Sequence, residues 1–199
     1  MDVFFLSVLV TSCLLLSGCS TRSPQKYLNL YNIQPPTVED FETCASIGCK
    51  RRSNLSYTKE EWKQIRDRFT PLAANAAEER EQISLAIALM EQINGPKNNT
   101  HLDNPRNKVL GAKGSQLDCI AETVNTTVGL ILLKQEGLIR FHDIGHPEHR
   151  GFAQFRLPHN TATILEKETE NCYTVDSWVG ANGELPKISL ISEWKASRF

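Results

Sequence analysis

The clearest periodic pattern of apolar residues lies in the middle of the chain. The residues in this pattern are Leu117, Ile120, Val124, Val128 and Ile131. Their spacings of three and four residues place them on one face of a helix. Ser115 and Asp118 resemble a capping box, so this helix is predicted to begin near Gln116. Cys119 then lies in or just after the first turn, where backbone N–H groups and the helix dipole favour a thiolate.

Two further helices are predicted before the cysteine helix. Thr58 opens a capping box, so one helix begins there and ends before Pro71. A second helix is predicted over residues 73–93, and the sequence Asn-Gly-Pro at residues 94–96 should end it. Residues 97–114 are polar and rich in Asn, Gly and Pro, which predicts a long loop leading to the cysteine helix.

After Gly137 the period of the apolar residues changes from that of a helix to that of strands. Five strands are predicted, over residues 138–142, 151–157, 160–166, 172–178 and 187–191. Helices first and strands second predict the α+β class, with a helical N-terminal half packed on an antiparallel sheet.

The N-terminus resembles the signal peptide of bacterial lipoproteins. Residues 3–16 form an apolar run that is short for a membrane span but fits a signal peptide. It leads into Leu16-Ser17-Gly18-Cys19, which resembles a lipobox with Cys19 as the lipidated residue. The segment before the run departs from the pattern, because it carries Asp2 and no basic residue. The alternatives are a plain secretory peptide and a buried helix.

This resemblance predicts a signal peptide over residues 1–18, a tether and loop segment over residues 19–57, and a functional domain over residues 58–199. It implies a periplasm-facing protein of the bacterial envelope, anchored to the membrane through lipid, more in keeping with the outer than the inner membrane. Because that compartment is oxidising, Cys44 and Cys49 are expected to form a local disulfide rather than a redox pair. A formal net charge of −1 argues against a nucleic-acid partner.

His159 and Asp176 lie on two predicted strands joined by a short polar connection, which predicts a hairpin. A turn centred between Lys167 and Glu168 would place them directly opposite, and a later turn would place them diagonally; both registers put them on one face. A carboxylate in that position fixes the tautomer of a histidine and supports its charge. If Cys119 packs against this face, its thiol pKa should fall below that of a free cysteine.

In their order and their elements, Cys119, His159 and Asp176 resemble the papain-like and transglutaminase-like superfamily of cysteine peptidases. Residues 62–194 also resemble a group of uncharacterised proteobacterial proteins, with shared patterns that include Gln116-Leu117-Asp118-Cys119, Pro158-His159 and Val175-Asp176-Ser177-Trp178. The resemblance implies a transglutaminase-like (papain-like) core and a catalytic triad. It also implies a glutamine donor to the oxyanion, for which Gln116 is the candidate at a spacing that departs from the family.

Three histidines are possible zinc ligands by residue type, namely His142, His146 and His149. Gly145 and Pro147 break the helix that would align them. No metal and no cofactor is therefore predicted, and this segment is expected to form a polar loop beside the cleft. Cys172 is open to two interpretations, a buried strand residue or a disulfide partner of Cys119.

Together these patterns predict a lipid-anchored envelope protein that hydrolyses an amide or peptide bond through a thioester. Cys119 would attack the carbonyl, His159 would act as base and then as acid, and Asp176 would orient His159. The alternatives are a non-catalytic binding or scaffold lipoprotein, and an acyl or γ-glutamyl transferase that uses the same residues. Cell-wall peptide, protein and small amides stay open as substrates.

Overall fold

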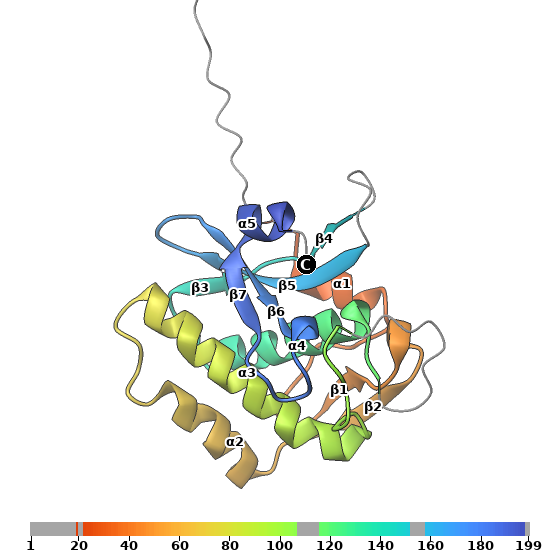
Figure 1. Cartoon of the computed structure of the whole chain (residues 1–199). Helices are drawn as coiled ribbons and strands as arrows, with labels where there is room; N and C mark the ends of the chain where they lie inside the picture. The colour runs from red at the N-terminus through yellow and green to blue at the C-terminus, as the bar shows by residue number, and fades with distance from the viewer. Residues whose placement is uncertain (1–18, 20–21, 107–115, 152–157, 198–199) are drawn as a thin grey trace, which may run out of the picture.

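The computed structural model describes residues 19, 22–106, 116–151 and 158–197, which form a mixed helical and antiparallel-sheet fold (Figure 1). The α+β class predicted from the order of the elements is confirmed. The predicted signal peptide over residues 1–18 lies outside the described residues, as does the predicted strand over residues 151–157 apart from its first residue. Within the described ranges, no helix is both long and apolar enough to span a membrane.

The main sheet is antiparallel, with the order β3-β5-β6-β7, and β4 pairs with β5 beyond the end of β3. Within this sheet, β5 pairs with three other strands, β3, β4 and β6. The strands are β3 (His142–Ile144), β4 (Glu148–Arg150), β5 (His159–Glu166), β6 (Cys172–Asp176) and β7 (Lys187–Leu190).

The two faces of the sheet pack against different helices. Ala162, Ile164 and Val175 share the main core with α4 (Cys119–Gln135) and α3 (Ala76–Asn98). The opposite face packs against α5 (Ile191–Ala196), where a smaller cluster contains Cys172, Ile191 and Trp194. In Figure 1, α5 lies above the sheet while α3 and α4 lie below it.

The first predicted helix is confirmed as α2 (Lys59–Arg66), with a reciprocal capping box between Thr58 and Glu61. The second, α3, continues beyond its predicted end at residues 94–96. Pro96 removes only one backbone donor, and the helix ends at Asn98. The next residue, Asn99, has a left-handed backbone (φ 64°) and donates its N–H to the Gly95 carbonyl.

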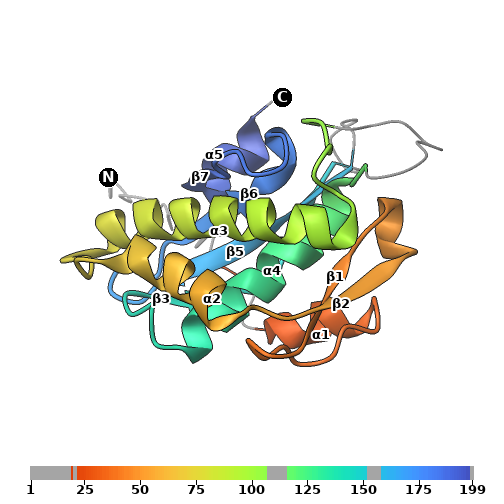
Figure 2. The ribbon, with the colours of Figure 1, turned by 90° about the horizontal axis from the view of Figure 1, so that it is seen from below.

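The segment predicted as a tether, residues 19–57, is folded from residue 22 onward. It contains α1 (Pro24–Asn29) and a hairpin of β1 (Phe41–Cys44) and β2 (Arg52–Leu55). Its apolar side chains, among them Leu28 and Ile33, belong to the main core, so the prediction of a loop was wrong there. Figure 2 shows α4 beside α3 and close to this hairpin, consistent with the contacts among these elements.

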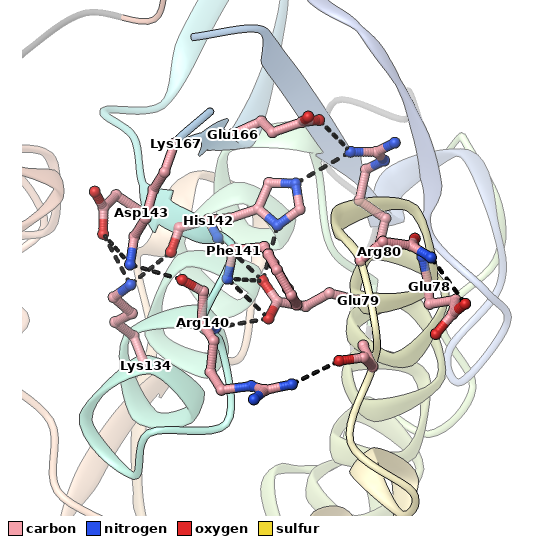
Figure 3. A network of polar contacts seen from close by, with 12 residues as sticks. Glu78, Glu79, Arg80, Lys134, Arg140, Phe141, His142, Asp143, Glu166 and Lys167 are labelled. Carbon is pink, nitrogen blue, oxygen red and sulfur yellow. Dashed lines mark hydrogen bonds and ion pairs between the residues drawn. The ribbon is translucent and has the colours of Figure 1, made fainter. Parts of the chain in front are cut away.

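A buried carboxylate explains why the predicted strand over residues 138–142 forms only from His142 onward. Glu79 of α3 is 1% exposed and accepts hydrogen bonds from the backbone N–H groups of Arg140, Phe141 and His142 at 2.6–3.0 Å. These donors are therefore used by a side chain rather than by a neighbouring strand. Figure 3 shows Glu79 reaching from its helix to this turn.

The same network surrounds the imidazole of His142, which is fully buried. Its Nδ1 lies 2.8 Å from Glu79, and its Nε2 lies 3.2 Å from Nη1 of Arg80, which also pairs with Glu166 at 2.6 Å. Because a carboxylate accepts and a guanidinium donates, both contacts are satisfied when Nδ1 of His142 donates to Glu79 and Nε2 accepts from Arg80. The network joins α3 to β3 and β5 (Figure 3).

In the part of the chain that the structure describes, two disulfides are present, between Cys44 and Cys49 and between Cys19 and Cys172, and Cys119 is free. The predicted pairing of Cys44 with Cys49 agrees with this arrangement. Cys172 is both a buried strand residue and a disulfide partner, but its partner is Cys19 and not Cys119.

Candidate functional site

The β5–β6 hairpin brings His159 and Asp176 together on one face, as the sequence predicts. Its register pairs Ala162 with Val175 and Leu165 with Cys172, so the two residues are diagonal neighbours with side chains on the same side. Nε2 of His159 lies 2.7 Å from Oδ2 of Asp176, and the two residues are 1% and 3% exposed.

Two tryptophans enclose this pair. The ring of His159 lies 4.6 Å from that of Trp178 and 5.4 Å from that of Trp194, between centroids. Nε1 of Trp194 also donates to Oδ2 of Asp176 at 3.0 Å. These apolar surroundings strengthen the contact between imidazole and carboxylate. With Nε2–H directed at Asp176, the basic lone pair of the neutral imidazole is on Nδ1.

Cys119 is the first residue of α4, and Asp118 caps the helix by accepting from the Ala121 N–H at 3.0 Å. The thiol is partly buried, and Nδ2 of Asn160 lies 3.8 Å from its sulfur. The sulfur therefore lies beside the start of β5, where Asn160 directly follows His159 in the chain.

The thiol is not the depressed-pKa cysteine that the sequence suggests. Burial raises the pKa of Cys119, as do Asp118 and Asp176, while hydrogen bonds from Asn160 lower it by less. Successive side chains of a strand point to opposite sides, so Asn160 rather than His159 faces the sulfur. Among the described residues, no hydrogen bond joins Cys119 to His159, and the expected ion pair is not formed in this structure.

Asn160 was missed by the sequence analysis, although one signal was available. It is a polar residue at the N-terminal end of the face of β5 that carries Ala162 and Ile164 toward α4. A polar residue at the end of an apolar face, next to a candidate catalytic histidine, is a candidate site residue.

Gln116, the predicted oxyanion donor, has its amide engaged elsewhere. Its Nε2 donates to the Leu102 carbonyl at 2.7 Å, and its Oε1 accepts from the backbone N–H of Asn104 at 3.2 Å. These bonds fix residues 102–104 against the start of the cysteine helix. The oxyanion role of Gln116 stays a prediction.

A cluster of carboxyl groups lies under the first turn of α4. Asp103 accepts from the Leu117 N–H at 2.6 Å, and its carboxyl group interacts with that of Glu122. Burial raises the pKa of Asp103 to about 6 and that of Glu91 to about 7. Burial, together with the neighbouring Glu91 and Asp103, also raises the pKa of Glu122.

This cluster should make stability depend on pH. Carboxyl groups with a raised folded-state pKa stabilise the fold fully below the unfolded value, roughly 4–4.5, and lose that contribution as pH rises through 6–7. Glu122→Gln keeps the shape but removes the charge, so it should raise the melting temperature at pH 8 by a few degrees and leave it nearly unchanged at pH 5. Thermal melts against exposed Glu60→Gln test this, and parallel pH profiles for both variants would contradict it.

The three histidines considered as zinc ligands contact protein atoms in separate places. His142 contacts Glu79, while Nδ1 of His146 lies 2.9 Å from the Pro147 carbonyl and Nδ1 of His149 lies 3.1 Å from Asn160. Among the described residues, no group of three His, Cys, Asp or Glu side chains could hold a metal ion.

The predicted lipidation site, Cys19, is half of the disulfide with Cys172. A sulfur atom in a disulfide cannot carry a thioether-linked lipid, so the bridge and the anchor exclude each other in one molecule. Lipid anchoring through Cys19 is therefore an alternative to the arrangement in this structure.

Comparisons of the chain with protein-family models, with curated proteins and with solved structures found no match. The papain-like resemblance therefore stays a prediction.

Proposed function

We propose that this protein is a cysteine hydrolase that cleaves an amide or peptide bond through a thioester on Cys119. The observation that carries the proposal is that the buried His159–Asp176 pair and the free thiol of Cys119, at a helix N-terminus, both lie at the start of β5. Asn160, next in the chain to His159, contacts the sulfur. The side chain of His159 points to the other side of β5, so the proposed proton transfer requires the thiol and the imidazole to come closer than they are in this structure. Hydrogen bonds between catalytic groups are often long before substrate binds.

In the proposed reaction, Nδ1 of His159 takes the proton of the Cys119 thiol as the sulfur attacks the carbonyl carbon. The carbon–nitrogen bond then breaks, and the imidazolium returns its proton to the leaving amine. Water, deprotonated by His159, attacks the thioester; the proton on the imidazole returns to the thiolate as the carboxylic acid is released. Asp176 holds the tautomer throughout and stabilises the imidazolium.

The two disulfides support an oxidising location for this enzyme. Disulfides persist in secreted and envelope proteins and are rare in the cytosol of most cells. Among the described cysteines, the bridged pairs Cys44–Cys49 and Cys19–Cys172 leave Cys119 as the thiol available for chemistry. We therefore retain the envelope as the proposed location, with lipid anchoring through Cys19 as the competing arrangement.

A non-catalytic binding or scaffold protein is the second candidate, because burial raises the pKa of Cys119. A panel of tagged peptide acyloxymethyl ketones separates the two, since these electrophiles label cysteines that a histidine activates. We expect labelling of the wild type, its loss in Cys119→Ala, and its loss on denaturation. Labelling that is equal in the native and denatured protein, or absent across the panel, would favour the scaffold.

A further inference from the structure

We propose that Asn160 is a catalytic residue whose side-chain amide donates to the Cys119 sulfur and stabilises its thiolate, and that His149 is the positioning residue that orients this amide. The inference deepens the proposed function and rests on it, because it takes Cys119 as the nucleophile. Neither residue belongs to the predicted triad.

The strand pairing places these groups in one line. In the β4–β5 register His149 is the direct partner of Asn160, and Nδ1 of its imidazole lies 3.1 Å from Oδ1 of Asn160. On the other side of the amide, Nδ2 of Asn160 lies 3.8 Å from the sulfur of Cys119. The asparagine therefore connects an exposed histidine to a partly buried thiol.

The orientation of the amide follows from its chemistry. A side-chain amide has one accepting oxygen and one donating NH2 group. When Nδ1 of His149 carries hydrogen, it donates to Oδ1 and the NH2 group of Asn160 faces the sulfur. When Nδ1 carries none, the favourable arrangement is the reverse, and an oxygen with partial negative charge faces the sulfur. Protonated His149 carries hydrogen on both nitrogens, so it permits only the donating orientation.

The charges around the sulfur make this donor important. Burial of the thiol, Asp118 and Asp176 all raise the pKa of Cys119, and Asn160 lowers it through its backbone N–H and its side chain. Because the side chain of Asp118 caps the helix, its carboxyl group is held in place beside the thiol. The backbone N–H of Asn160 opposes these effects most strongly, and its side-chain amide adds to that opposition.

The rate of alkylation of Cys119 by iodoacetamide, measured from pH 6 to 10 without substrate, tests both roles. Asn160→Ala should raise the thiol pKa and lower the rate at pH 7 by about three- to tenfold. His149→Ala should lower it by a smaller factor, because the amide then loses its fixed orientation. His149→Gln should restore most of the rate, since its side-chain NH2 can still donate to Oδ1 of Asn160. Exposed His101→Ala is the matched control and should leave the rate unchanged.

Thermal melts establish that each variant is folded, and Asn160→Ser replaces Asn160→Ala if the latter does not fold. A pH profile of Asn160→Ala that superimposes on the wild type overturns the proposal. A wild-type rate in His149→Ala overturns the role of His149. Alkylation needs no turnover. If the protein proves not to be a hydrolase, the alkylation rates would therefore still show whether Asn160 and His149 affect the Cys119 thiol. Conversely, peptide-probe labelling with an unchanged Asn160→Ala profile would reject this inference alone.

Discussion

Glu79→Gln is expected to lower the free energy of unfolding by about 3–5 kcal/mol, the cost of disrupting a buried, hydrogen-bonded charge network. Burial alone would raise the pKa of Glu79, but bonds from His142 and from the N–H groups of Arg140 and Phe141 outweigh it and lower the pKa. Glutamine has only one accepting oxygen, so buried donors are left without partners. It also places an NH2 group against other donors.

Urea denaturation of Glu79→Gln and Glu81→Gln provides the measurement. Glu81 lies on the same helix but is exposed, so its replacement should change stability by less than about 0.5 kcal/mol. The stabilisation from Glu79 should be present above roughly pH 4.5 and be lost as pH falls through its lowered folded-state pKa. Equal stability of the two variants at pH 7 would show that the network in Figure 3 contributes little.

Removing the long-range disulfide should have the second large effect. The bridge joins residues 153 apart in sequence, so Cys19→Ser should destabilise the fold by about 2–5 kcal/mol through the freedom gained by the unfolded chain. Cys49→Ser is the matched control, because the bridge from Cys44 to Cys49 spans only 5 residues and constrains the unfolded chain less. The chain-entropy model gives about 2 kcal/mol for such a short loop.

Non-reducing peptide mapping of the protein purified from its native cells identifies the chemical state of Cys19. The structure leads us to expect its peptide joined to that of Cys172. A diacylglycerol on Cys19 with a free thiol at Cys172 would contradict this, and would establish the lipid anchor that the lipobox predicts. In that case Cys172 would be a buried thiol packed beside Trp194, close to the candidate site.

Local signals in the sequence predicted several parts of this structure. The capping box at Thr58 located α2, and the regular apolar spacing located α4. That helix begins at Cys119 rather than near Gln116 as predicted, because the side chain of Asp118 is its N-cap. The hairpin prediction placed His159 and Asp176 on one face. Side chains alternate between the two faces of a strand, so both registers that were considered gave this result. Each of these depends on residues close together in the chain.

The features that the sequence did not predict depend on contacts between distant residues. Leu28 of α1 is buried through tertiary packing, and sequence alone cannot determine that Cys19 pairs with Cys172. The contact between Asn160 and Cys119 depends on how α4 crosses β5, which periodicity does not fix. The hydrogen bonds from backbone N–H groups to Glu79 likewise delay the predicted strand over residues 138–142, which forms only from His142 onward.

The central claim, that His159 activates Cys119, is tested most directly by the rate of peptide acyloxymethyl ketone labelling in the wild type and in His159→Ala. General-base catalysis contributes about 10²–10⁴-fold, so labelling of Cys119 should fall by at least about a hundredfold in the variant. Thermal melts should show that the variant is folded. Labelling of folded His159→Ala at the wild-type rate would contradict the claim and leave Cys119 as a structural cysteine.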